Sequence, residues 1–247
     1  MTEPLLATQD IGVRFGDFRA LSEVTLSVMS GTVHSVIGPN GAGKTTLFNV
    51  LTGRLSPSEG RVVLAGRDVT RLPAHRRVHL GMARSFQVTN IFPELTVGEN
   101  LRLALQAVSG AQPWIFWRGV DPDLGRMQAV AEEVGLTARI SWRAGDLSHG
   151  GQRALEIGMA LAADPRIIFL DEPLAGMGID DVHRTKELIR GLAPARTVVL
   201  IEHNMRVVLD ISEQVTVLAQ GRTIAEGPPA LIRGDAAVRE AYLGSGM

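Results

Sequence analysis

The feature that most constrains this chain is a glycine-rich run, Gly-Pro-Asn-Gly-Ala-Gly-Lys-Thr, at residues 38–45. It matches the pattern GxxxxGK[ST] and lies between a strand-like run, Val33–Ile37, and a helical pattern, Thr45–Leu51. In such a unit, glycines let consecutive backbone N–H groups turn toward phosphate oxygens, and the start of the helix adds its positive dipole end. The pattern therefore predicts a nucleotide phosphate site, occupied by Mg-ATP.

The residue types within this run fit that chemistry. Lys44 would neutralise the β- and γ-phosphates, and the Thr45 hydroxyl would bind Mg²⁺. The rest of the loop would consist of Gly38, Pro39, Asn40, Gly41, Ala42 and Gly43. The competing interpretation is a glycine-rich turn that binds nothing.

Short β-branched runs alternate with longer helical patterns, which indicates an α/β fold with a mainly parallel, buried sheet. In the first part, Leu5–Val13, Val24–Val28 and Val33–Ile37 are strand-like and leave no room for helices. Arg61–Ala65 follows a Pro-Ser-Glu-Gly turn, so we expect a small antiparallel layer against the main sheet. Later strands are predicted at Arg166–Leu170, Arg196–Ile201, Gln214–Leu218 and Arg222–Glu226, the last two joined around Gln220-Gly221.

Helical patterns dominate from Thr96 to about Ala144. Thr96 can act as an N-cap, and Glu99, three residues later, completes a capping box before Leu101–Leu105. We therefore expect a helical layer in the middle of the chain.

Composition excludes several classes of protein. Apolar residues make up 45% and charged residues 21%, and the formal net charge of -1 does not suggest nucleic-acid binding. The absence of cysteine removes disulfides and thiolate metal sites. No apolar run approaches the roughly 20 residues needed to span a bilayer, and the first residues do not resemble a signal peptide. We expect a cytoplasmic enzyme that would serve a membrane only from outside the bilayer.

Two carboxylates end the apolar run Arg166–Leu170. Asp171 is placed to hold Mg²⁺ through water, and Glu172 to accept the proton of an attacking water. His203 follows another strand and could hydrogen-bond the γ-phosphate. Gln87 is an amide suited to Mg²⁺ or water. The competing interpretations are two solvated acids at a strand end, a surface or core histidine, and ordinary polar surface.

A second helix start has phosphate-binding character. Leu147–Arg153 leads into the predicted helix Ala154–Ala163, with Ser148 as a good N-cap followed by glycines that expose N–H groups. An ordinary helix cap is the competing interpretation. Since the first site already has such a helix, this one is more simply explained as serving a nucleotide held by another copy.

The order of these motifs resembles the ATP-binding-cassette (ABC) ATPases across nearly the whole chain. One branch is especially similar, the ATPase subunits of importers for branched-chain and other hydrophobic amino acids, which includes urea-type relatives. The residues that carry the resemblance are Arg84–Gln87, Leu95–Asn100, Leu147–Gly150, Leu155–Met159, Pro173–Met177, Glu202–Met205 and Ala241–Gly244. It implies a single domain, 1–247, with a RecA-like core plus antiparallel layer (1–86 and 153–247) and a Gln87-loop, helical and signature part (87–152).

The resemblance also implies roles in a head-to-tail homo- or heterodimer with two ATPs between the subunits. Each ATP would be held by the P-loop of one copy and by Ser148 and Gly150 of the other. The roles within one copy are phosphate and Mg²⁺ binding for Lys44, Thr45 and Thr46, Mg²⁺ and water sensing for Gln87, Mg²⁺ support for Asp171, general base for Glu172, and γ-phosphate contact for His203. Phe15 would stack on adenine, with Phe18 as a substitute and a buried core Phe as the alternative.

Four positions depart from the usual pattern of that family. His149 replaces a glycine and Gly151 a glutamine in the signature, and we expect function to survive both. Gly178 stands where an acidic or amide residue is common, which puts one cross-dimer contact in doubt. Asn204 replaces an aspartate after His203, a minor change.

The implied function is an ATP-driven motor at the inner face of the plasma membrane, with two transmembrane permease subunits and, indirectly, a substrate-binding protein. The stretch from Gln87 to about Leu105 would receive a permease helix, with Ile91, Phe92 and Leu95 exposed for docking or else packed beneath the helices. The alternatives are urea-type import, lipopolysaccharide-type export, a non-transport ABC ATPase, and a P-loop kinase or GTPase.

Overall fold

The computed structural model describes residues 3–85, 91–109 and 124–243. Its main sheet has the strand order β10-β9-β3-β8-β7-β6, in which only β10 runs antiparallel to its neighbour. These strands are β3 (Val33–Ile37), β6 (Met82–Arg84), β7 (Ile167–Asp171), β8 (Thr197–Ile201), β9 (Gln214–Ala219) and β10 (Arg222–Gly227). Every residue of β3, β7 and β8 is buried, as expected for parallel strands covered on both faces. The predicted α/β fold is thus confirmed.

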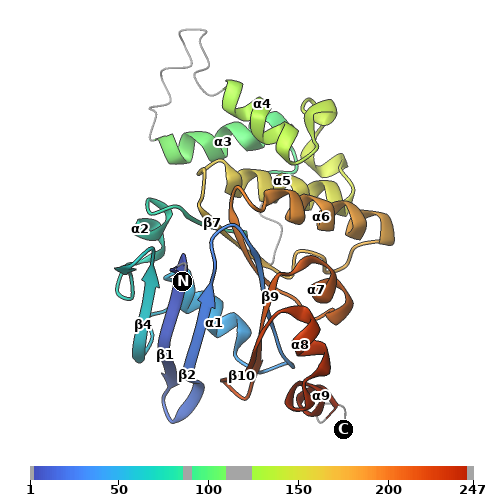
Figure 1. Ribbon diagram of the computed structural model, residues 1–247. Coiled ribbons are helices and arrows are strands. Elements are labelled where there is room, and N and C mark those ends of the chain that lie inside the picture. The colour runs from blue at the N-terminus through green and yellow to red at the C-terminus, as the bar shows by residue number, and fades with distance from the viewer. Residues whose placement is uncertain (1–2, 86–90, 110–123, 244–247) are drawn as a thin grey trace.

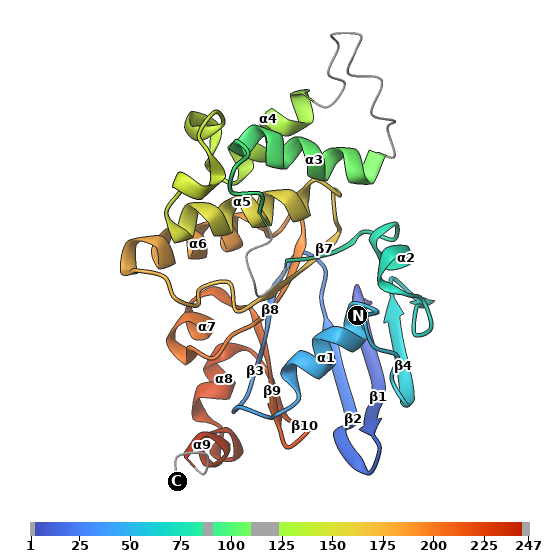
Figure 2. The same ribbon diagram turned by 180° about the vertical axis from the view of Figure 1, so that it is seen from behind.

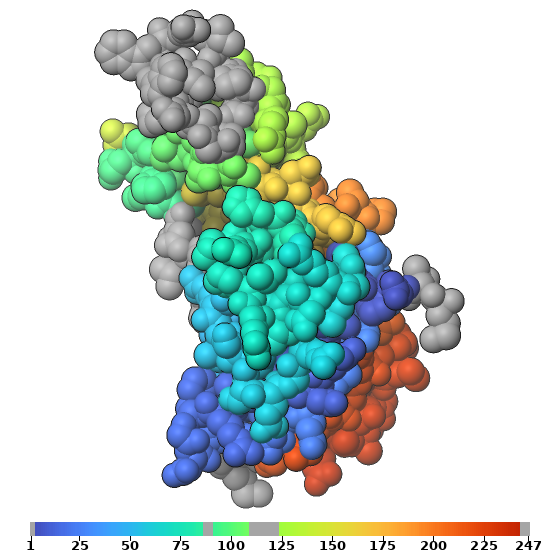
Figure 3. Space-filling model, turned by 90° about the vertical axis from the view of Figure 1, so that its left-hand side faces the viewer, coloured from blue at the N-terminus to red at the C-terminus, as the bar shows by residue number. Residues whose placement is uncertain are grey.

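The predicted antiparallel layer forms a second sheet with the order β2-β1-β4-β5 (Figure 1). Its strands are β1 (Leu6–Phe15), β2 (Phe18–Val28), β4 (Glu59–Leu64) and β5 (Arg67–Asp68). The second strand begins at Phe18, six residues before the predicted start at Val24, because it pairs with β1 along most of its length. Figure 3 shows this layer and α2 covering one side of the molecule, with α3 and α4 above them.

The helices cover both faces of the main sheet and surround its upper end (Figures 1 and 2). They are α1 (Lys44–Leu51), α2 (Ala74–Val78), α3 (Val97–Ser109), α4 (Leu124–Glu133), α5 (His149–Leu161), α6 (Ile179–Leu192), α7 (Met205–Ile211), α8 (Pro229–Gly234) and α9 (Ala236–Leu243). Short 3₁₀ turns lie at η2 (Thr137–Arg139) and η3 (Ala144–Asp146). Within the described ranges, no helix has the length and apolar character needed to cross a bilayer.

The start of α3 confirms the predicted capping box. The Glu99 carboxylate accepts from the Thr96 N–H at 2.7 Å, and Thr96 Oγ1 accepts from the Glu99 N–H at 3.2 Å. The helix predicted at Ala154–Ala163 instead begins at His149, directly after its Ser148 cap.

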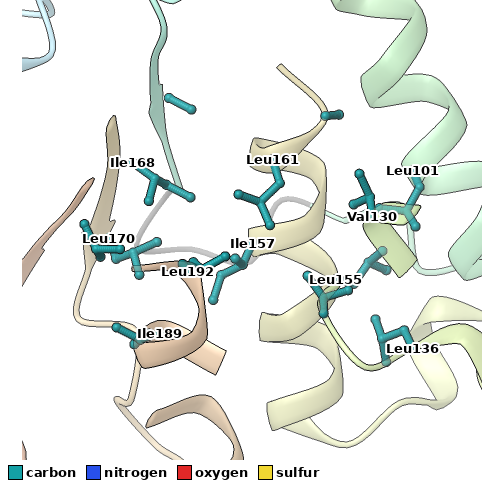
Figure 4. Packing of buried hydrophobic residues seen from close by; sticks show 14 of the residues in the cluster. Leu101, Val130, Leu136, Leu155, Ile157, Leu161, Ile168, Leu170, Ile189 and Leu192 are labelled. Carbon is teal, nitrogen blue, oxygen red and sulfur yellow. The ribbon is translucent and has the colours of Figure 1, made fainter. Parts of the chain in front are cut away.

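Apolar clusters lie on the two faces of the main sheet. One fills the space between the sheet and α3–α6. Figure 4 shows Ile157 and Leu161 of α5 on the side that faces Leu192 and the strand with Ile168 and Leu170, and Leu155 near Leu136. The other joins α1 to both sheets and contains an edge-to-face pair, Phe48 and Phe169, with ring centroids 5.5 Å apart. Helix α1 and Ala42 of the loop before it are therefore held in this second core.

Candidate functional site

The glycine-rich loop joins β3, in the middle of the main sheet, to α1. Gly38 has φ 153°, and a Cβ there would lie 2.1 Å from the Leu218 carbonyl oxygen, so only glycine fits. Gly43, the N-cap of α1, has φ 98° and offers no side-chain cap, which leaves the N–H groups of the first turn free of one. The N-terminal end of α1 can therefore bind an anion through its backbone N–H groups.

Lys44 lies buried across this loop. Its ammonium donates to the carbonyl oxygens of Gly38 at 2.7 Å and Pro39 at 2.9 Å. Burial lowers the pKa of Lys44, while the charges of Glu172 and Asp171 act in the opposite direction. Two further loop-side groups, the exposed Thr45 and the half-buried Thr46, follow in the first turn of α1.

Asp171, the last residue of β7, is held by a residue that sequence reasoning did not assign a role, Arg84 of β6. The Arg84 Nη2 donates to Asp171 Oδ2 at 2.8 Å, and both side chains are about nine-tenths buried or more, with 10% and 4% exposed. Arg84 Nη1 also donates to Asn49 Oδ1 at 2.8 Å and Thr52 Oγ1 at 3.2 Å on α1. One guanidinium therefore links the edge strand, the predicted Mg²⁺ carboxylate and the phosphate helix.

Glu172 and His203 come together at the ends of β7 and β8. The His203 Nδ1 lies 3.9 Å from Glu172 Oε1, and the two side chains are 59% and 28% exposed. Glu172 has φ 45°, an uncommon backbone conformation for a non-glycine residue, and its N–H donates to the Ile201 carbonyl at 3.1 Å. The carboxylate thus stands in an open position beside an imidazole.

Glu202 is a second residue that sequence reasoning overlooked. It is 1% exposed, and its carboxylate accepts from the N–H of Leu174 at 3.2 Å and of His203 at 3.3 Å. Burial raises the pKa of Glu202, and these two backbone donors partly offset the effect. Glu202 therefore links the turn after Glu172 to the backbone at His203.

Ser148 and Gly150 lie at the start of α5. Ser148 caps α5, since its Oγ accepts from the Gly151 N–H at 3.2 Å. Asp181 of α6 accepts from the Ser148 hydroxyl at 3.3 Å and from the Gly150 N–H at 3.2 Å. Hollows of about 640 and 550 Å³ adjoin Ser148, and no residue of the phosphate loop lines either one. Within one chain, the hollows beside Ser148 are therefore separate from the surface of the phosphate loop.

The first turn of α5 instead flanks Glu172 of its own chain. His149, Gln152 and Arg153 line a hollow of about 90 Å³ together with Glu172. Arg153 Nη2 donates to the Asp171 carbonyl at 2.7 Å, and Arg153 forms a buried ion pair with Glu156.

The two aromatic candidates lie at facing ends of a hairpin. Phe15 of β1 pairs with Phe18 of β2, and their exposed fractions are 52% and 67%. The alternative that Phe15 is a core residue is therefore wrong. Gln87 lies outside the described residues.

The apolar residues considered for docking differ in exposure. Phe92 is 52% exposed, and its backbone is held by Asn100, which accepts from its N–H at 2.8 Å. Ile91 packs against the cluster beneath the helices, and Leu95 is half-buried. A groove of about 250 Å³ beside Arg84 is also lined by Met82, Met159 and Ala160.

Comparisons with known proteins agree with this architecture. The family model described as "ABC transporter" matches residues 21–175, and the model described as "Branched-chain amino acid ATP-binding cassette transporter" matches residues 222–247. The chain therefore belongs to the ABC transporter family, as one of its ATP-binding subunits, which are ATPases.

Full-length relatives narrow the position within that family. The chain is 38% identical to the high-affinity branched-chain amino acid transport ATP-binding protein LivG of Salmonella typhimurium, with 99% of each covered. It is 39% identical to BraF of Pseudomonas aeruginosa, with the same coverage, and 34% identical to the lipopolysaccharide export ATP-binding protein LptB of Haemophilus influenzae, with 97% of each covered. The crystal structure of the ADP conformation of MJ1267, an ATP-binding cassette of an ABC transporter, has a TM-score of 0.86 at 33% identity and covers 98% of this chain and 100% of that one.

Proposed function

We propose that this chain is the ATP-hydrolysing motor subunit of an importer for branched-chain or other hydrophobic amino acids. Its similarity to LivG and BraF over nearly the full length, together with the match at 222–247, is the observation that carries the substrate class. It acts from the cytoplasmic side, peripheral on the inner face of the plasma membrane, beside two transmembrane permease subunits and, indirectly, a substrate-binding protein.

The phosphate loop binds ATP, and its parts have separate tasks. The residues 38–43 and the start of α1 present N–H groups to the phosphates, and Thr46 lies beside them in the first turn. Lys44 gives up the Gly38 and Pro39 carbonyls and turns to the β- and γ-phosphates, a smaller step than entering from solvent because the ammonium already lies across the loop. An exposed aromatic, Phe15 or Phe18, stacks on the adenine.

The oxygen groups near this loop fit Mg²⁺. Mg²⁺ is usually bound by one or two protein oxygens plus phosphates and water, and Thr45 and Asp171 supply a hydroxyl and a carboxylate. No cluster of three metal-binding side chains occurs in the described part of the chain, which agrees with a metal held mainly by its nucleotide. When bound, Mg²⁺ neutralises charge on the β- and γ-phosphates, and Gln87 is the further ligand in this proposal.

Glu172 is the general base for hydrolysis. Its carboxylate accepts the proton from the attacking water, and His203, 3.9 Å away, donates to the γ-phosphate and keeps the base oriented. Arg84 holds the Asp171 carboxylate in place by an ion pair. The two adjacent acids therefore have different tasks, Mg²⁺ binding for Asp171 and proton acceptance for Glu172.

A second ATP-binding subunit completes the site. Ser148 and Gly150 carry phosphate-binding features, yet the two hollows of about 640 and 550 Å³ beside Ser148 contain no residue of the phosphate loop of the same chain. A head-to-tail pair, homodimeric or heterodimeric, brings them to the ATP held by the partner. ATP closes the pair, hydrolysis reopens it, and the permeases follow between inward- and outward-facing states. Gly178 alters one contact across this pair, while His149, Gly151 and Asn204 are tolerated.

The groove beside Arg84 and the exposed Phe92 are the docking surface for a permease helix. Arg84 contributes to both this groove and the Asp171 ion pair, so docking and the nucleotide site meet at one side chain. Selectivity for the transported molecule belongs to the permeases and the binding protein.

Replacing Glu172 with Gln tests the assignment of the base. The variant should bind ATP, form a stable dimer in size-exclusion chromatography with light scattering, and lose about 99% or more of its turnover, because a general base contributes roughly 10²–10⁴-fold. Lys44→Ala in the same background should abolish ATP-driven pairing. Arg61→Gln, at an exposed position of β4, should match the wild-type chain. A Glu172→Gln chain that stays monomeric and hydrolyses ATP normally contradicts the proposal.

Lipopolysaccharide-type export is the second candidate, favoured by the similarity to LptB. The match at 222–247 favours the amino-acid branch instead. The neighbouring genes decide between them, because an importer needs permease and binding-protein genes beside it. Co-purification of the chain with export-type permeases alone would overturn the import assignment.

A further inference from the structure

At the N-terminal end of α5, the Ser148 hydroxyl and the N–H groups of Gly150 and Gly151 already have hydrogen-bond partners. The Gly151 N–H donates to Ser148 Oγ, so the cap uses one donor of the first turn. The Gly150 N–H and the Ser148 hydroxyl both donate to the two oxygens of Asp181, at 3.2 and 3.3 Å. These are the same two residues that the proposed function assigns to the partner's ATP.

Asp181 fits closely against this helix end. It lies in the first turn of α6, and a Cβ added to Gly150 would lie 2.5 Å from the Asp181 carboxyl carbon. Arg139 and Arg184 line the adjoining hollow of about 640 Å³, but neither forms an ion pair with Asp181 in the described structure. The carboxylate is thus compensated by the helix end and the hydroxyl rather than by a neighbouring cation.

We infer that Asp181 is an internal competitor for the phosphate that Ser148 and Gly150 would receive from a second subunit. This inference rests on the proposed function. A carboxylate and a phosphate cannot both accept from the same N–H and hydroxyl, and their negative charges repel each other at that distance. Asp181 must therefore release these donors as the pair closes.

The consequence is a control on when the pair forms. Since the donors are occupied in the separate chain, ATP has to displace the carboxylate, which raises the ATP concentration needed for closure. After hydrolysis, the return of Asp181 to the same donors helps the pair to open. Asp181 sets the balance between open and closed pairs without touching the reacting atoms.

The test uses Asp181→Asn in the full-length Glu172→Gln chain, so that turnover does not obscure pairing. Asn keeps the size and one acceptor oxygen but loses the charge. We expect the ATP concentration for half-maximal dimer, measured by light scattering, to fall about fivefold, the size expected for one charge at a helix N-terminus. Asp181→Ser should shift pairing in the same direction. Fluorescent ATP binding at protein concentrations too low for pairing should not change.

Asp180→Asn is the matched control, because Asp180 lies in the same first turn of α6 yet makes no hydrogen bond to Ser148 or Gly150. It should leave the pairing curve of the Glu172→Gln chain in place. The inference is overturned if Asp181→Asn equals Asp180→Asn or weakens pairing, since Asp181 would then merely shape the helix end. If the parent Glu172→Gln chain never pairs with ATP while its Mg-ATP binding is intact, the proposed function fails and this inference fails with it.

Discussion

At the scale of single residues, His34 illustrates how burial decides a charge state. It lies in β3 with 0% exposure, and its Nε2 shares a 2.8 Å hydrogen bond with Thr216 Oγ1. Burial lowers the pKa of His34 from 6.5 to about 4, so the folded chain keeps the imidazole neutral over most of the acidic range.

This shift predicts a pH dependence of stability. Between about pH 4 and 6.5, the unfolded chain binds a proton at His34 that the folded chain excludes, so stability rises with pH across that window. The full effect is about 3 kcal/mol. Urea unfolding at about pH 5 and 7 should show a smaller pH difference for His34→Gln than for the wild type. Burial raises the pKa of Glu202, which acts with the opposite sign in both proteins and cancels in the comparison. Burial also raises the pKa of Glu226, but the Thr216 hydroxyl links Glu226 to His34, so both proteins should carry Glu226→Gln. Equal pH differences would contradict the prediction.

Residues with local sequence signals could be predicted, and residues defined by distant partners could not. Lys44 begins a helix, while Asp171 ends a strand and Glu172 follows it, each within a recognisable local pattern. The structure brings Glu172 and His203 within 3.9 Å of each other. Their catalytic roles stay predictions. Arg84 has no such local pattern, because its role depends on distant partners. These are Asp171, 87 positions later, and Asn49 and Thr52, more than 30 positions earlier.

At the scale of elements, the end of the phosphate helix depends on a cation from another helix. Arg77 of α2 is 1% exposed and donates to the carbonyls of Val50 at 2.9 Å and Leu51 at 2.6 Å, in the last turn of α1. It also donates to the carbonyls of Leu72 and Thr70. Helix α1 has no basic residue of its own there, so Arg77 supplies both the donors and the favourable charge.

Replacing Arg77 with Met should therefore destabilise the fold. Several buried carbonyls would lose their donors, at about 3 kcal/mol in total, and thermal unfolding followed by circular dichroism should show it. Arg76→Met removes an exposed arginine of the same helix and should change stability by less than about 0.5 kcal/mol. Similar melting temperatures for the two variants would show that the carbonyls find other donors.

The bounds of helices were likewise predictable where local sequence signals set them and unpredictable where distant contacts did. The Thr96–Glu99 capping box is local and was predictable from spacing alone. The start of α5 at His149 was not, because Gly150 and Gly151 each disfavour helix by about 1 kcal/mol. Asp181, from another helix, helps to hold that turn. Tertiary contacts thus extended this helix beyond its local signal.

At the scale of the whole molecule, binding at the phosphate loop should stabilise the folded chain. The loop joins β3 and α1, which contribute to the apolar cluster between the two sheets. Mg-ATP at 100 times its dissociation constant should add about 2.7 kcal/mol, or roughly 5–10 °C in melting temperature. Lys44→Ala should lose this shift, whereas Arg61→Gln should keep it. A Lys44→Ala chain that retains the full shift would place the nucleotide elsewhere.

The fold class was predictable because buried parallel strands are read directly as apolar runs. The strand order was not, since β3 pairs with β8 and β9, each more than 150 residues further along the chain. The division into 1–86 with 153–247 and 87–152 stays a prediction, and its second boundary falls inside the continuous helix α5.

Helix α5 is one rigid rod of 13 residues, about 20 Å long. Its Arg153 holds the Asp171 carbonyl of its own chain, while in the proposed pair its first residues face the nucleotide of the other chain. Each ATP would then contact the start of an α5 helix whose Arg153 is hydrogen-bonded to the active centre of the other chain. With one such helix from each chain, the two nucleotide sites of the proposed pair would be coupled, so that release of phosphate from one site would affect the other.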